Sequence, residues 1–140
     1  AFRAKVRDIS EFIVEVGIRS EGLQPVKASV TYHEPCHLCH AQGISAQPRK
    51  LIKAIPGIEL REMNEASWCC GSAATWGLKF QGESQQVLDR KLGNVAATGA
   101  DYLVTANPGC QLQLAWGLRE AGMKQEVLHL MELLGRATPE

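Results

Sequence analysis

Five cysteines fall in three short groups along this chain, and two of them are adjacent. The groups are Cys36 with Cys39, Cys69 with Cys70, and Cys110 alone. Because the number is odd, disulfide bonds cannot pair all the cysteines. Adjacent residues also hold their α-carbons about 3.8 Å apart, which is shorter than most disulfides accept. The pattern therefore favours free thiols in a reducing compartment, where they bind a metal or carry out redox chemistry.

The size and charge of the chain narrow the classes of function. A chain of 140 residues fits one domain with an adequate core. It has 15 basic and 15 acidic residues and a formal net charge of zero, without a polybasic run, so nucleic acid and anionic membrane are poor partners. No apolar run approaches the roughly 20 residues of a membrane span. We expect a cytoplasmic protein without a direct membrane span, and we expect this chain, which begins at Ala1, to be a fragment of a longer subunit.

Short β-rich runs alternate with amphipathic helices along the sequence. The pattern predicts strands at 28–33, 58–61, 101–105 and 127–129, with 58–61 near an edge of the sheet. Helices are expected at 6–16, 48–55, 84–98, 108–122 and 130–134. We expect one domain over 1–140, with an N-terminal helix in 1–24 and a motif-bearing core in 28–135. The alternation predicts an α/β fold: a small open, mainly parallel sheet with helices on both faces.

Each group of cysteines follows one of the predicted strands. Cys36 and Cys39 follow the first, Cys69 and Cys70 the second, and Cys110 the third. In an open parallel sheet the loops beyond the carboxyl ends of the strands form the binding crevice. We therefore expect the thiols to converge at one edge, although they lie far apart in sequence.

Two of the cysteines are expected at the start of helices. Asn107 is a good N-cap and Pro108 a good first helical residue, so Cys110 falls in the first turn, and Pro35 places Cys36 similarly. The free N–H groups and dipole of a helix N-terminus stabilise a thiolate. Thiolates are the form that binds iron and zinc.

Three other interpretations of the cysteines remain open at this point. Zinc needs four Cys or His ligands, which Cys36, Cys39, His40 and the adjacent pair could supply, and soft thiolates alone do not separate zinc from iron–sulfur. The Cys36–His40 segment also matches the C-x-x-C-H signature of a c-type haem, which leaves the other cysteines without a role. Buried structural cysteines are the third interpretation.

The histidines and tryptophans allow less specific predictions. His33 is expected to end a strand, and His129 to lie in the core or cap a helix. His37 and His40 are close enough in sequence to the cysteines to donate hydrogen bonds to them or to contact a substrate. Core packing, or shielding of a metal centre, is expected of the tryptophans beside the adjacent pair, Trp68 and Trp76.

The cysteine pattern resembles the signature of the CCG (cysteine-rich) domain family. That signature is a lone cysteine, then Cys-Cys-Gly, then Cys-x-x-Cys. Over residues 28–135 the chain looks most similar to the C-terminal domain of glycolate oxidase iron–sulfur subunits. The segments that carry the likeness are Tyr32–Leu38, Cys69–Ala73, Thr98–Asp101 and Asn107–Gln113.

The resemblance implies an α/β domain that holds an iron–sulfur cluster, 4Fe-4S and noncubane in the heterodisulfide reductase relatives. The implied ligands are Cys36, Cys69, Cys70 and Cys110. Gln113 stands where the second cysteine of Cys-x-x-Cys would lie, so disulfide-reducing chemistry is not expected. Cys39 is an extra thiol that could replace the missing ligand.

The resemblance also implies a place in a larger complex. A glycolate oxidase-type complex would oxidise a 2-hydroxy acid on its FAD-containing subunits and pass electrons through iron–sulfur centres toward quinone, at the inner membrane through its partners. This chain has neither the ferredoxin-type cysteine runs nor a G-x-G-x-x-G flavin loop, so it is expected to relay electrons and to be inactive alone. The alternative is a zinc-binding or structural docking module of this or a related complex, of the lactate-utilisation or heterodisulfide reductase-like kind.

Overall fold

A parallel four-stranded sheet forms the centre of the molecule. The structure is a computed structural model that describes residues 2, 5–18 and 20–139. The strands are β1 (Ala28–His33), β2 (Ile58–Leu60), β3 (Tyr102–Thr105) and β4 (Glu126–His129). Their order is β2-β1-β3-β4, and every neighbouring pair is parallel. This confirms the predicted fold class and places β2 at an edge.

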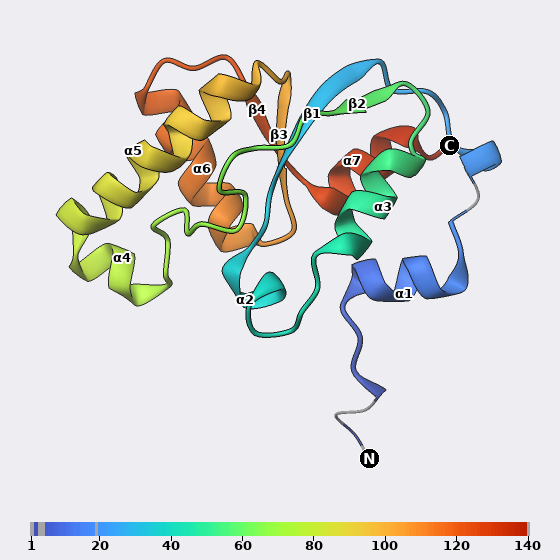
Figure 1. Cartoon of the computed structure of the whole chain (residues 1–140), viewed down its shortest axis with the longest axis horizontal. Helices are drawn as coiled ribbons and strands as arrows, with labels where there is room; N and C mark the ends of the chain where they lie inside the picture. Colours follow the sequence, from blue (N-terminus) through green and yellow to red (C-terminus); the bar gives the residue numbers. More distant parts are fainter. Residues whose placement is uncertain (1, 3–4, 19, 140) are drawn as a thin grey trace.

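Helices cover both faces of this sheet (Figure 1). They are α1 (Ile9–Val16), α2 (Cys36–Cys39), α3 (Ala46–Ala54), α4 (Thr75–Lys79), α5 (Gln81–Thr98), α6 (Pro108–Glu120) and α7 (Leu130–Ala137), with a 3-10 turn η2 (Ser20–Gly22). On one face, α3 and α7 bury Val30, Tyr32 and Val104; on the other, α5 and α6 bury Leu103. Successive strand residues point to opposite faces, so the two cores alternate along β1 and β3.

The strand order positions a crevice. From β1 the chain moves outward to β2, then returns past β1 to β3 on its other side. The connections therefore leave the carboxyl ends of β1 and β3 in opposite directions, and the space between them is where ligands bind in open α/β sheets. The segment after β1 carries Cys36 as the first residue of α2, and the segment after β3 carries Cys110 in the first turn of α6.

The N-terminal helix differs from its prediction. Asp8 caps α1 in a capping box with Glu11, so the helix begins at Ile9 and leaves Val6 outside it. Ile13 and Val14 pack against the core, whereas Ile9 and Val16 are exposed. The predicted apolar face was therefore only partly right, because the helix is rotated so that Ser10 is buried.

Four further differences concern helices and tryptophans. The helix predicted from residue 48 begins at Ala46, α5 begins at Gln81, and α4 was not predicted. The predicted core packing of Trp68 and Trp76 was wrong, because they are 44% and 38% exposed. Trp68 lies under the guanidinium of Arg90, 4.6 Å from its ring centre, at the surface.

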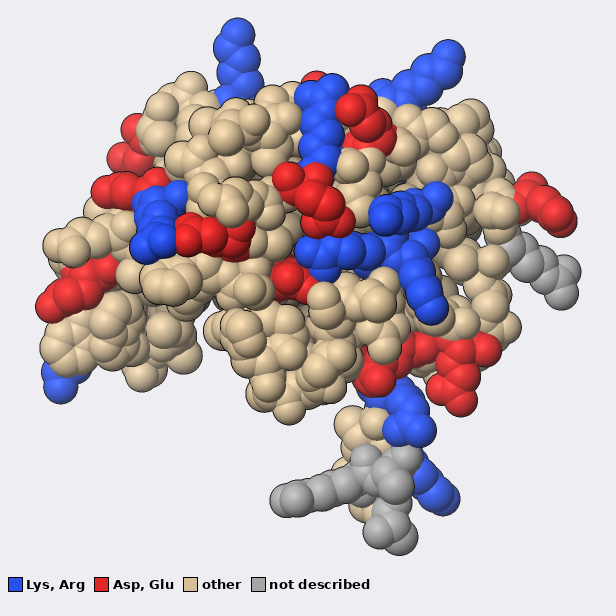
Figure 2. Space-filling model, viewed as in Figure 1, with Lys and Arg blue, Asp and Glu red and all other residues tan. Residues whose placement is uncertain are grey.

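The surface is mixed in charge. On the face shown in Figure 2, basic and acidic side chains lie interspersed, and the surface over α2 carries neither. Within the described residues, no helix combines the length and the hydropathy that a bilayer crossing requires.

Candidate metal centre

The segments that follow β1, β2 and β3 meet at one pocket of about 370 Å³. Its wall includes Cys36 from the first segment, Ser72–Ala74 from the second, and Asn107 and Cys110 from the third. The three segments therefore meet at the carboxyl edge of the sheet, and the convergence of all the thiols stays a prediction. The pocket lies at the crevice that the strand order creates.

Two sulfurs and an imidazole lie together at the buried end of this site. The ligand atoms of His33, Cys70 and Cys110 are all within 4.8 Å of one another. All three residues are buried. Cys69 is next to Cys70 in the sequence, and the two thiols lie close enough for each to shift the pKa of the other. All five cysteines are free thiols.

A turn that only glycine can form sets the direction of the adjacent cysteines. Gly71 has φ +88°, and a Cβ there would lie 2.4 Å from the carbonyl oxygen of Ser84. The hydroxyl of Ser84 donates a 2.8 Å hydrogen bond to the Gly71 carbonyl, and the N–H of Gly71 donates to the sulfur of Cys69 at 3.3 Å. The close approach of the turn to α5 therefore fixes where the two sulfurs lie.

A buried lysine holds the chain just before that turn. Lys91 of α5 is completely buried, and its ammonium donates to the carbonyls of Glu65 at 2.5 Å and Ala66 at 3.2 Å. The backbone N–H of Glu34, directly after β1, donates to the same Ala66 carbonyl at 3.0 Å. Burial lowers the pKa of Lys91 to about 8, while the nearby Cys70 thiol acts in the opposite direction. The lysine thus joins α5, the end of β1 and the segment that leads into the turn at Cys69–Gly71, which we call the cysteine turn.

The third cysteine is positioned by a helix cap, as predicted. The side chain of Asn107 accepts a 2.9 Å hydrogen bond from the N–H of Cys110, and Pro108 is the first residue of α6. The Asn107 amide also lies 3.5 Å from Nδ1 of His37. The cap therefore links the start of α6 with α2, which carries Cys36.

A carboxylate braces the loop that leads to Cys36. Glu34 accepts hydrogen bonds from the hydroxyl of Ser45 and, at 2.6 Å, from Arg49, which also pairs with Glu62. Burial pushes the pKa of Glu34 upward, but the hydrogen bonds from Arg49 and Ser45 outweigh it and hold that pKa below its usual value. Glu34 is therefore a structural anion at neutral pH.

The crowding and burial of the thiols raise the pKa of two of them. The hydrogen bond with Cys110 and burial raise the pKa of Cys70 to about 11, and the contact with Cys70 and burial also raise the pKa of Cys69. Neighbouring thiols resist shared ionisation because their thiolates repel each other. A metal that supplies positive charge removes this penalty and binds the deprotonated sulfurs.

Other candidates from the sequence lie less centrally. Cys39 is outside the pocket wall, and its thiol donates to the carbonyl oxygen of Cys36 at 3.8 Å, so its role as a ligand stays a prediction. His40 lies 3.3 Å from the carbonyl oxygen of Ser67. His129 caps α7, one of the two roles predicted for it. Gln113 donates a 3.2 Å hydrogen bond to the Ser84 hydroxyl, which in turn donates to the Gly71 carbonyl. The Gln113 side chain therefore contacts the cysteine turn through Ser84.

His33 is the residue that the sequence reasoning missed. It ends β1 as predicted, but its ring is 1% exposed and both ring nitrogens are buried without a hydrogen-bond partner in the described part of the chain. Burial, and then the charge of Lys91, lower the pKa of His33 to about 3, so the imidazole is neutral at neutral pH. Its place before Glu-Pro-Cys was the available signal, because it puts an imidazole on the strand that leads into Cys36.

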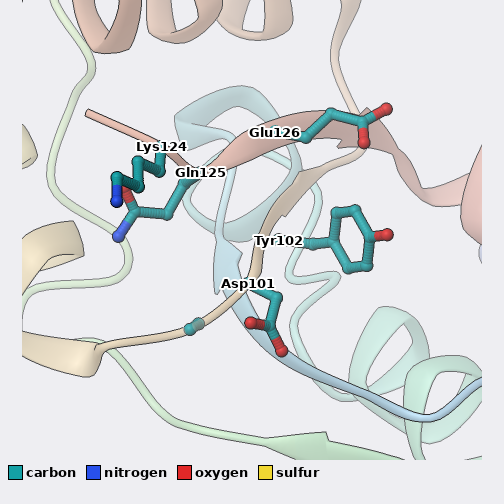
Figure 3. A pocket seen from close by; sticks show the side chains of 6 residues that line it. Asp101, Tyr102, Lys124, Gln125 and Glu126 are labelled. Carbon is teal, nitrogen blue, oxygen red and sulfur yellow. The ribbon is translucent and has the colours of Figure 1, made fainter. Parts of the chain in front are cut away.

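A second hollow lies at the opposite edge of the sheet (Figure 3). It is lined at the starts of β3 and β4 by residues that include Asp101, Tyr102 and Glu126. Asp101 accepts from the N–H and hydroxyl of Ser29, and Arg136 pairs with Glu126 and lies over the ring of Tyr102. These side chains are already used to join strands and α7, so this hollow is structural.

Comparison with known proteins agrees with the geometry. The family model described as "Cysteine-rich domain" (CCG) matches residues 30–115, which include Cys36, both adjacent cysteines and Cys110. The chain belongs to the cysteine-rich domain family.

Several curated relatives are longer than this cysteine-rich chain, and two of them are named as subunits. It is 39% identical over 137 residues to the probable glycolate oxidase iron-sulfur subunit of Bacillus subtilis, covering 96% of the chain and 31% of the relative. It is 32% identical to lactate utilization protein A of Bacillus cytotoxicus (93% and 54%). It is 37% identical to a fumarate reductase (CoM/CoB) subunit of Methanothermobacter marburgensis (94% and 27%). The chain thus spans between about a quarter and about half of the length of these relatives.

The segments that build the site are uncharged. Residues 35–48, 66–78 and 102–118 contain no Asp, Glu, Lys or Arg. They nonetheless expose large apolar side chains: Trp68, Trp76, Leu78, Leu112 and Trp116. We call these five side chains the apolar rim. Exposed apolar side chains near a site are typical of surfaces that contact another molecule.

Proposed function

We propose that this domain binds an iron–sulfur centre and relays electrons within a glycolate oxidase-type complex. The electrons come from an FAD-containing subunit that oxidises a 2-hydroxy acid, and they continue toward quinone. The chain acts as one domain of a longer iron–sulfur subunit, in the cytoplasm, and reaches the inner membrane through its partners. The names of the relatives, two of which are subunits of an oxidase and a reductase, support this assignment.

The observation that carries the proposal is the meeting of cysteine segments at one edge of the sheet. Cys70 and Cys110 lie together, Cys69 adjoins them, and Cys36 shares a pocket wall with Cys110. Soft thiolates are ligands for iron–sulfur clusters and zinc. Adjacent cysteines suit a cluster better, because they can bind different iron atoms, whereas both rarely bind one zinc.

The donor set and its surroundings fit such a centre. Cys36, Cys69, Cys70 and Cys110 provide four thiols, the number that a common iron–sulfur cluster requires. The buried, unpartnered nitrogens of His33 beside two of these sulfurs indicate that the site is built to hold something more. When bound, an iron–sulfur centre supplies one-electron transfer, while the chain holds it and sets its exposure to water.

The residues of this chain have separable roles in that task. The Gly71 turn and the Asn107 cap fix the sulfurs, and the N–H of Gly71 donates toward Cys69 sulfur. Lys91 places a buried cation near the thiols of Cys69 and Cys70. Hydrogen bonds and charge near the sulfurs are the means by which proteins tune the reduction potential of a cluster.

Reduction by the partner subunit tests the proposal. In the anaerobically purified complex, a 2-hydroxy acid should reduce the flavin and then bleach the visible absorption of this domain's centre. The Cys70→Ser complex should still reduce its flavin but lose that bleaching. A wild-type centre that stays oxidised while the flavin is fully reduced would show that the domain is not on the electron path.

A zinc-binding or docking module is the second candidate. The compact group of His33, Cys70 and Cys110 favours it to a degree, because three such ligands also suit a single zinc ion. Elemental analysis of the same purified complex separates the two: zinc without sulfide supports the module, and iron with sulfide supports the relay.

A further inference from the structure

Three polar side chains are buried without partners on one face of the central strands. They are Thr31, His33 and Thr105, each at most 1% exposed, and their side-chain polar atoms have no hydrogen-bond partner in the described residues. His33 lies directly opposite Thr105 in the β1–β3 register, and Thr31 lies two residues before His33 on the same face. Leaving a buried polar group unsatisfied is unfavourable, so these three side chains call for a partner that the described residues do not provide.

The same face carries the thiols. Leu103, the register partner of Thr31, belongs to the core cluster that contains Cys70 and Cys110. A ring nitrogen of His33 lies within 4.8 Å of both sulfurs. The unpartnered imidazole thus faces the position that any centre bound by Cys70 and Cys110 must occupy.

The cysteine motif of this chain is one thiol short. Gln113 occupies the last position of Cys-x-x-Cys, and its side chain bonds to Ser84 behind the cysteine turn. Cys39 is outside the pocket wall and its thiol contacts its own helical turn. His33 is the buried nitrogen donor that lies next to the remaining thiols.

We propose that His33 is a nitrogen ligand of the inorganic centre, in the place that the motif's second terminal cysteine would fill. This inference rests on the proposed iron–sulfur function and adds one ligand to it. Imidazole replaces thiolate on an iron of Rieske-type centres, where it raises the reduction potential. A mixed Cys/His ligand set therefore gives this centre a higher potential than an all-thiolate set in the same site.

Isotope labelling of the unaltered chain is the primary test. The chain is produced with ¹⁵N-histidine, reconstituted anaerobically with iron and sulfide, and assayed for both elements before any spectroscopy. Electron–nuclear double resonance of its paramagnetic state should show a strong nitrogen coupling that changes with the label, as expected for a directly bound imidazole. If no iron binds, the proposed function itself fails; if iron and sulfide are present without this coupling, only the histidine ligand is disproved.

Variants assign the coupling to one of the four histidines. His33→Gln should lose it, whereas His129→Asn, which keeps an N-cap on α7, should retain it. His33→Cys should keep the iron, lose the coupling and lower the midpoint potential. Cys39→Ser should change none of these, and a loss of iron there would instead make Cys39 the ligand.

Two further measurements keep the test decisive. If His33→Gln does not fold, replacing His37, His40 and His129 one at a time should leave the coupling intact in each case, which assigns it to His33. If neither redox state is paramagnetic, ⁵⁷Fe Mössbauer spectra should show one iron site distinct from the thiolate-bound sites. Identical all-thiolate sites in the wild-type chain would overturn the proposal.

Discussion

At the scale of single residues, the proposed centre depends on a backbone position that admits only glycine. Gly71 has a positive φ, and a Cβ at this position would collide with the Ser84 carbonyl oxygen. Gly71 directly follows Cys69 and Cys70, two of the proposed ligands. A side chain there must move either the turn or α5. Because the sulfurs are fixed by this turn, the movement reaches the metal site.

Gly71→Ala should therefore destabilise the fold and empty the centre. We expect a loss of about 2–4 kcal/mol in the free energy of unfolding, from left-handed strain and overpacking together. Urea unfolding and iron content of the reconstituted protein measure the two effects. Gly122→Ala is the matched control, since Gly122 also has a positive φ (+63°) but open space around it, and it should cost about 1–2 kcal/mol with normal iron. Equal iron content in both variants would contradict the role of the turn.

Some residues of the candidate site could be predicted from the sequence, and others could not. The four implied ligands could be named because the family resemblance rests on short motifs, which are a local property of the sequence. His33 could not, because its lack of partners depends on Thr105 from a distant strand and on the packing of the cysteine turn. Trp68 was misjudged for the same reason: Arg90 covers one side of its ring at the surface, which spacing does not show.

At the scale of elements, caps and strand ends set the geometry of the site. The strand at 28–33 was predicted with its observed bounds, because Pro35 follows it and β-branched and aromatic residues fill it. The start of α6 was also predicted, because Asn107 and Pro108 are a local signal. By contrast, α4 follows Ala73 and Ala74, both with positive φ, and such a conformation of alanine is unfavourable on its own and is imposed by the surrounding fold.

Removal of the α6 cap should affect both stability and metal. Asn107→Ala should cost about 1 kcal/mol of unfolding free energy and lower iron occupancy, because Cys110 lies in the capped turn. Asp8→Ala is a matched control, since it removes the cap of α1, which lies outside the site. It should cost a similar free energy with full iron occupancy. If the two variants lose iron equally, the cap acts through general stability and not through Cys110.

The opposite end of the sheet should show a dependence on acid. Hydrogen bonds from the N–H and hydroxyl of Ser29 hold the pKa of Asp101 below its usual 3.8. A lowered carboxyl pKa adds stability that is complete above 3.8 and is lost as the pH falls through the folded-state value. Asp101→Asn should therefore have a lower free energy of unfolding than wild type at neutral pH. This difference in free energy should become smaller in acid. Denaturant unfolding across this range measures it, with Glu120→Gln, an exposed helix residue, expected to track wild type. A difference in free energy that stays constant with pH would show that the Asp101 carboxylate does not stabilise the fold through Ser29.

At the scale of the whole molecule, the charged and uncharged regions have different tasks. Ion pairs such as Arg49 with Glu34 and Glu62 brace the fold, and none of these three residues lines the pocket. The three uncharged segments gather the thiols and present the apolar rim. A partner subunit that docks on this rim would come close to the centre and exclude water from it, as a short electron path requires.

Leu78→Ser should weaken binding to the proposed flavoprotein partner without unfolding the domain. Leu78 is 76% exposed on α4, so its replacement removes little from the core of the isolated domain. If the partner buries it, the loss is roughly 1–2 kcal/mol, or about 5- to 30-fold in Kd. Titration of the flavin subunit measures this. Phe12→Ser, on exposed α1, is the control and should bind normally. If Leu78→Ser binds the flavin subunit with unchanged affinity, Leu78 of the apolar rim is not part of the interface.

Under the proposed function, thiols from three segments hold one iron–sulfur centre at the carboxyl edge of the sheet. Iron and acid-labile sulfide per chain, measured after anaerobic preparation of wild type and of single serine variants at Cys36, Cys69, Cys70 and Cys110, test it most directly. We predict both elements in the wild type and a marked loss of both in each variant. A wild-type protein prepared without air that contains neither iron nor sulfide would contradict it.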